Sequence, residues 1–151
     1  MTVPAGFPKT GEDELLLRWW RSQGERGLLI LEVQLGLSGP GDWPDRRRHK
    51  RLDGLYLADA AADQVVSWNE VGADRLAELI ARRPATVLES KAELNTDVIG
   101  QAVAGIDMLS RSYPHHGRLD AVATVWGPVT DPVLSWVAGR RGITVYSASP
   151  P

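Results

Sequence analysis

Two spacings of apolar residues run along this chain of 151 residues, and each spacing predicts one kind of element. Between positions 15 and 20, leucines and tryptophans recur at helical spacing behind an acidic turn, so a helix should begin at Thr10 or Gly11. A near-continuous apolar run follows over 28–35. This run is too short for a typical helix, and it therefore predicts a buried strand.

The remainder of the chain continues as strands and helices in turn. A loop rich in glycine and proline is expected over 36–44, and the polar segment 58–69 has only a short apolar patch at Val65 and Val66. The apolar patterns predict strands over 51–58, 86–93, 119–126 and 142–146, and helices through 76–80, 95–112 and 131–139.

Composition narrows the class of protein. Hydrophobic residues make up 43% of the chain, which predicts a single domain over 1–151 with a substantial core. The absence of cysteine excludes a disulfide framework and a thiolate metal site. The N-terminus lacks a signal-peptide pattern, and no apolar run approaches the roughly 20 residues needed to cross a bilayer. We therefore expect a cytoplasmic protein with no membrane partner.

The net charge of −2 hides a local basic run. Such a run is by default a solvated edge of the molecule. Arginine forks pair well with phosphate oxygens, however, so the run is also the expected contact for nucleic acid. Its members are Arg46, Arg47, Arg48, Lys50 and Arg51.

Candidate chemistry centres on the strand predicted over 86–93. Side chains alternate faces along a strand, so Glu89 and Lys91 should point the same way. Asp53, in the preceding strand, is the candidate for a second carboxylate beside them. Two carboxylates that bind a divalent cation, together with an ammonium that serves the attacking water, would suit the hydrolysis of phosphodiesters.

Glu32 interrupts the apolar run over 28–35. Burial of an unpaired carboxylate costs on the order of several kcal/mol, so Glu32 should either reach solvent at the end of the strand or take part in the site. These two interpretations are about equally supported by the sequence.

Other nucleophiles and metal ligands have weaker patterns. His115 and His116 have no third ligand at metal spacing, and we interpret them as solvated loop residues. Ser38, Ser90 and Ser110 have no base near them in the sequence, which argues against a serine nucleophile.

The order of these elements resembles the PD-(D/E)XK nuclease superfamily. The resemblance is carried by Asp53, by the triplet Glu89-Ser90-Lys91 and by Gly100-Gln101 on the following helix, and it spans roughly residues 12–146. It implies an α/β, restriction-endonuclease-like fold with an αβββαβ core, a mixed sheet flanked by helices, and a helical insertion between the second and third strands. Leu52 precedes Asp53 where a proline would be usual.

The resemblance also implies a set of site residues. A literal Pro-Asp pair occurs at Pro44-Asp45, but it lies in a polar loop without strand alternation, so Asp45 is not expected at the site. Acids of this superfamily bind Mg²⁺, for which Mn²⁺ commonly substitutes, and a lysine serves the attacking water. The implied catalytic residues are Asp53, Glu89, Lys91 and Gln101, and the implied metal ligands are Glu32, Asp53, Glu89 and the carbonyl of Ser90.

The leading expectation is a metal-dependent endonuclease that cuts DNA and can act as a homodimer. A degenerate nuclease fold that binds nucleic acid or a protein without catalysis is the second hypothesis. An α/β protein of another class that binds a small ligand is the third.

Overall fold

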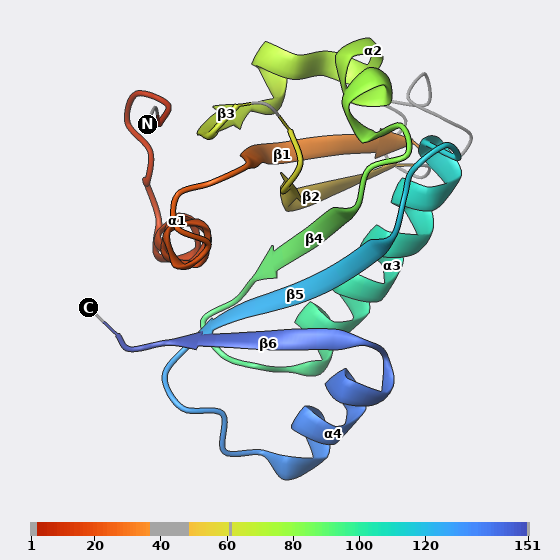
Figure 1. Ribbon diagram of the computed structural model, residues 1–151. Coiled ribbons are helices and arrows are strands. Elements are labelled where there is room, and N and C mark those ends of the chain that lie inside the picture. Colours follow the sequence, from red (N-terminus) through yellow and green to blue (C-terminus); the bar gives the residue numbers. More distant parts are fainter. Residues whose placement is uncertain (1–2, 37–48, 61, 151) are drawn as a thin grey trace.

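The computed structural model describes residues 3–36, 49–60 and 62–150. Four helices and six strands are present in this part of the chain (Figure 1). Their bounds are α1 Gly11–Ser22, β1 Leu28–Gly36, β2 His49–Leu57, β3 Gln64–Ser67, α2 Trp68–Ile80, β4 Ala85–Ser90, α3 Thr96–Ser112, β5 Leu119–Trp126, α4 Pro132–Arg140 and β6 Ile143–Ala148.

The strands form one mixed sheet in the order β3-β1-β2-β4-β5-β6. Strand β2 runs antiparallel to both β1 and β4, whereas β4, β5 and β6 run parallel to one another. With α1 before β1 and α3 between β4 and β5, this is the restriction-endonuclease-like core. The predicted fold class is confirmed.

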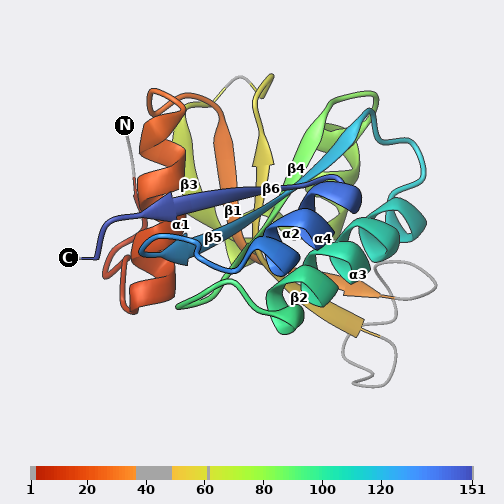
Figure 2. The same ribbon diagram turned by 90° about the horizontal axis from the view of Figure 1, so that it is seen from below.

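Helices cover both faces of the sheet (Figures 1 and 2). Helix α1 packs on one face through Leu16 and Trp20, which share an apolar cluster with Leu29 and Leu88. Helices α2 and α3 pack on the other face, and α4 joins α3 there through a second cluster. Strand β4 is therefore buried on both faces, because Val87 faces α3 and Leu88 faces α1.

The insertion between β2 and β4 contains a strand as well as a helix. Strand β3 pairs in parallel with β1, with Val65 beside Leu29 and Val66 beside Ile30. The sequence predicted only a helix here, so that part of the prediction was incomplete. Four residues with a short apolar patch give a weak strand pattern, and parallel pairing to a distant segment supplies the missing stabilisation.

Capping residues locate the predicted helix starts. Thr10 accepts a hydrogen bond from the Asp13 backbone, and Asp13 bonds back to the Thr10 backbone, which forms a capping box at α1. The Asn95 side chain accepts from the Val98 backbone at α3. Both helices begin where the sequence predicted. Among the described residues, none of the helices has the length and apolar character needed to cross a membrane.

Candidate functional site

The site forms where β1 and β2 change the face to which their side chains point. Ile30 and Val33, three residues apart, lie in the same apolar cluster, although strict alternation would place them on opposite faces. Leu52 and Leu55 on β2 behave in the same way. The pairs Leu31–Gly54 and Val33–Leu52 flank this change, so Glu32 lies opposite Asp53.

Glu32 produces the change in β1 through its backbone. Its φ is 57°, in the left-handed region that a residue with a side chain rarely adopts. The Glu32 side chain is 72% exposed, and its Oε1 lies 3.7 Å from Nη1 of Arg51. The carboxylate thus avoids burial by turning to solvent, and the structure does not gather it with Asp53 and Glu89.

Asp53 and Glu89 meet where β2 separates from β4. The paired positions end at Gly54–Leu88, and the next step along both strands places Asp53 opposite Glu89. Beyond this point the contact between the two strands is made by the Asp53 side chain, whose Oδ2 accepts a hydrogen bond of 2.8 Å from the Ser90 backbone N–H. The structure therefore brings together the two carboxylates that the sequence singled out.

Glu89 is a buried acid with little polar compensation. Its side chain is 1% exposed, and within the described part of the chain neither carboxylate oxygen receives a well-aligned hydrogen bond. The pKa of Glu89 is raised to about 8, chiefly by burial and next by the nearby charge of Asp53, whereas Lys50 acts in the opposite direction. The site therefore disfavours the ionised carboxylate and would bind a cation that stabilises it.

Lys50 is the cation that the structure places beside Glu89. Its Nζ lies 3.1 Å from Glu89 Oε1, and its side chain is 14% exposed. The sequence assigned Lys50 to a basic run that contacts phosphate, and it missed this ion pair. With strict alternation along β2, Lys50 and Asp53 would point to opposite faces of the sheet, because they are three residues apart. The change of face near Asp53 instead brings Lys50, like Leu52, to the face that α3 covers.

Lys91 and Gln101 form no hydrogen bond or ion pair with the two carboxylates. Lys91 follows the last residue of β4, and its backbone N–H extends the strand by donating to the Thr124 carbonyl at 3.1 Å. Gln101 lies one helical turn before Gly105, whose surface packs on Leu52 and Val87. Both side chains are half-buried, and neither forms an ion pair or a side-chain hydrogen bond with the described residues.

The Ser90 hydroxyl points to the face of the sheet opposite to that of Glu89 and forms a hydrogen bond there. It lies 2.6 Å from Oγ1 of Thr124, and both residues are fully buried. A metal-binding role for Ser90 would therefore use its carbonyl, as the family resemblance implies, and not its hydroxyl.

Most of the basic run has no structural description. Arg46, Arg47 and Arg48 lie outside the described residues, as does Asp45. Arg51 is exposed on β2 and forms the ion pair with Glu32 described above.

The donor set can be tested against a divalent cation. Across residues 3–36, 49–60 and 62–150, no group of three or more Asp, Glu, His or Cys side chains is placed to hold a metal. Two carboxylates remain, and Mg²⁺ is commonly held by one or two carboxylates together with water and substrate phosphates. Asp53 and Glu89 fit this pattern, and Glu89 Oε2, which lies outside the ion pair with Lys50, favours it.

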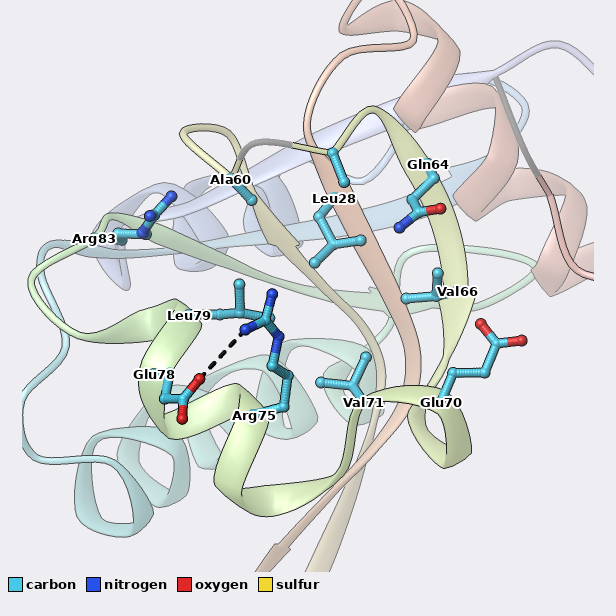
Figure 3. A pocket seen from close by; sticks show the side chains of 11 residues that line it. Leu28, Ala60, Gln64, Val66, Glu70, Val71, Arg75, Glu78, Leu79 and Arg83 are labelled. Carbon is cyan, nitrogen blue, oxygen red and sulfur yellow. Dashed lines mark hydrogen bonds and ion pairs between the residues drawn. The ribbon is translucent and has the colours of Figure 1, made fainter.

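A cavity of about 410 Å³ lies elsewhere, between the insertion and the sheet (Figure 3). Apolar residues such as Leu28, Val66 and Leu79 line its interior, and Arg75 pairs with Glu78 at its rim, with 3.3 Å between their side chains. Neither Asp53 nor Glu89 lines it. This cavity and the pair of carboxylates are therefore at separate places in the molecule.

One sequence interpretation concerning histidine was wrong. His116 is half-buried rather than solvated, and its Nε2 lies 2.8 Å from Oγ of Ser110. Its Nδ1 also contacts the Gly117 carbonyl. The helix α3 and the following turn bring these residues together, six positions apart.

Comparison with known proteins gives little beyond the fold. No protein-family model matches this chain, and no curated protein matches its sequence. A solved structure described as an EndoMS-dsDNA2 complex aligns with 94% of this chain and 46% of its own chain, at 11% identity and a TM-score of 0.48. This chain thus spans about half the length of that one. At such low similarity no functional residue is carried over from that protein to this chain.

Proposed function

We propose that this protein hydrolyses phosphodiester bonds in DNA with a divalent metal ion. The observation that supports this most strongly is the meeting of Asp53 and buried Glu89 where β2 separates from β4. A buried carboxylate with unsatisfied oxygens is costly unless it serves a ligand. Together with the half-buried Asp53 carboxylate, it forms a pair of acids suited to Mg²⁺ or Mn²⁺.

Each residue would have a separate role. Asp53 and Glu89 would hold the cation, with the Ser90 carbonyl as a further oxygen ligand. When bound, the cation would offset charge on the phosphate and promote deprotonation of water. Lys91 follows Glu89 by two positions in extended chain and has no ion pair within the described residues, so its ammonium is free to orient the attacking water.

DNA is the proposed substrate because of the basic run that leads into β2. Arg46, Arg47 and Arg48 directly precede the strand that carries Asp53. Phosphate contacts at that point would place the DNA backbone close to the two carboxylates. Gln101, on the α3 face near this end of the sheet, would support the site or contact substrate.

Cleavage of supercoiled plasmid tests this proposal. The purified protein is incubated with plasmid, single-stranded or branched DNA in Mg²⁺, Mn²⁺ or chelator, and nicked and linear products are quantified. Asp53→Asn and Glu89→Gln should each abolish metal-dependent cleavage. Glu78→Gln, which alters an exposed carboxylate at the rim of the separate cavity, is the control and should cut as the wild type does.

The ion pair between Lys50 and Glu89 supports a second candidate function. An ammonium already partners the carboxylate, as expected of a nuclease fold that binds nucleic acid or protein without catalysis. Metal-independent DNA binding by a protein that cuts none of the three substrates would favour this candidate. Cleavage that survives in both carboxylate variants would reject the proposed site.

A further inference from the structure

We propose that Lys50 is an internal counter-ion that competes with a divalent cation for Glu89, so that metal binding requires the Lys50 ammonium to leave the carboxylate. This inference rests on the proposed function, because it assumes that Glu89 is a metal ligand. It assigns a role to Lys50, which is not among the expected catalytic residues. It also implies that the metal binds less tightly than it would without the Lys50 ammonium.

The contact distances support direct competition. Lys50 Nζ lies 3.1 Å from Oε1 of Glu89, whereas Oε2 of Glu89 receives no hydrogen bond from the described residues. Asp53 brings a second negative charge next to Glu89. Lys50 thus neutralises part of the charge of a pair of acids of which Glu89 is buried, which is also what a bound cation would do.

The surroundings of Lys50 allow the ammonium to leave. Its side chain is 14% exposed, in contrast to 1% for Glu89, so solvent reaches the lysine and hardly reaches the acid. Its stem passes over α3 where Gly105 leaves space, since a Cβ built on Gly105 would lie 3.4 Å from Lys50 Cε. A flexible four-carbon stem can turn away from the carboxylate while the backbone of β2 stays in place.

Charge repulsion explains why the ammonium and the metal would exclude each other. An ammonium that stayed beside Glu89 would lie within a few ångströms of a doubly charged ion in a site of low polarity, where such repulsion is strong. A lysine at the same place in a purely structural ion pair would keep its position, and its removal would not improve metal affinity. Metal affinity therefore separates the two roles.

The experiment measures binding of Mg²⁺ or Mn²⁺ alone by calorimetry, without DNA and at a pH above about 8, where Glu89 is ionised even without metal and can pair with Lys50. Wild type, Lys50→Met and Lys50→Arg are compared, with Glu89→Gln as the variant that lacks the ligand. Arg118→Met is the control, because it breaks an exposed ion pair of the same 3.1 Å length, with Asp120. Lys50→Met should lower the Kd by at least about tenfold, on the scale expected for removing a nearby unit charge. Lys50→Arg and Arg118→Met should stay within about twofold of wild type.

Folding is checked by circular dichroism and urea unfolding, and Lys50→Gln replaces Lys50→Met if the latter does not fold. An unchanged or higher Kd in the uncharged variant would overturn the counter-ion role while leaving the nuclease proposal intact. Absence of metal binding in every variant would overturn both. Binding that appears only when Lys50 is uncharged would support the inference and show that the wild-type lysine blocks the site.

Discussion

At the scale of single residues, the site depends on a carboxylate that the fold buries at a cost. Glu89 is enclosed by the sheet and α3, faces Asp53, and has Lys50 as its cationic partner. Replacing the buried pair with an apolar one would often be neutral or stabilising. The retention of charge here therefore points to function and not to stability.

The raised pKa of Glu89 predicts a pH dependence of stability. Without metal, the folded protein keeps a proton on Glu89 up to about pH 8, whereas the unfolded chain releases it near the ordinary value of 4.5. The proton on Glu89 therefore contributes to the free energy of unfolding in full below about pH 4.5. This contribution falls as the pH rises toward 8 and is absent above pH 8. The slope can reach about 1.4 kcal/mol per pH unit.

Glu89→Gln should remove this decline, because an amide does not titrate. Urea unfolding in chelator at several pH values from 5 to 9 measures it. The stability of wild type should fall relative to the variant up to about pH 8 and then level off. Profiles that run parallel over the whole range would contradict the predicted burial of an ionisable Glu89.

Lys91 is predicted to act on the reaction and not on metal binding. Lys91→Ala should lower the cleavage rate by about two to four orders of magnitude, the usual contribution of a positioned acid-base or electrostatic group. Its Kd for Mg²⁺ should change little, because a protonated amine offers no lone pair to the metal. Lys9→Ala, an exposed lysine before α1, is the control. A loss of metal binding equal to the loss of rate would reject this division of roles.

At the scale of elements, the change of face in β1 and β2 lets one sheet both form the apolar core and hold polar site residues. Before it, Leu28 and Ile30 pack into the α2 and α3 side, and after it Val33 and Leu35 do the same. Glu32 and Asp53 occupy the positions at the change itself. The strands can therefore keep a continuous apolar core on both sides of a polar site.

Close packing of α3 on this region predicts unequal effects of two glycine substitutions. A Cβ at Gly105 would lie 2.8 Å from Leu52 Cδ2 and 3.0 Å from Val87 Cγ1, whereas a Cβ at Gly100 meets nothing within 4 Å. Gly105→Ala should destabilise the fold by about 1–3 kcal/mol through overpacking. Gly100→Ala should stabilise it by about 0.5–1 kcal/mol through helix propensity.

Urea unfolding of both glycine variants measures the difference, with Gly100→Ala as the matched control on the same helix. Equal stability of the two variants would mean that α3 moves easily away from β2 and β4. In that case the position of Gln101 relative to Glu89 would be less restrained than the packing indicates.

At the scale of the whole molecule, with a net charge of −2, we expect the proposed DNA substrate to approach through a local basic surface. The run at positions 46–51 is the expected surface, and it leads into β2, the strand that carries Asp53. Cytoplasmic location and assembly as a homodimer stay predictions.

Replacing Arg46, Arg47 and Arg48 with alanine should weaken DNA affinity and reduce its salt dependence. Each lost phosphate contact lowers the slope of log K against log salt by about one. Binding is measured by fluorescence anisotropy at several salt concentrations. Alanine at Arg75, Arg118 and Arg140, which are exposed on other elements, is the control for the change in net charge. A slope equal to wild type would place the DNA contact elsewhere.

The sequence by itself determined every element except β3, and it singled out the two carboxylates that meet in the structure. Apolar spacing and caps located α1 and α3, because these signals act within a few residues. The order of strands brought Asp53 and Glu89 together. Tertiary structure alone decided three features: β3 pairs with distant β1, Glu32 turns to solvent, and Lys50 contacts Glu89. The positions of Glu32 and Lys50 follow from a left-handed backbone at Glu32 and the linked change of face in β2. A sequence pattern read with a strict period of two cannot predict such a change of face.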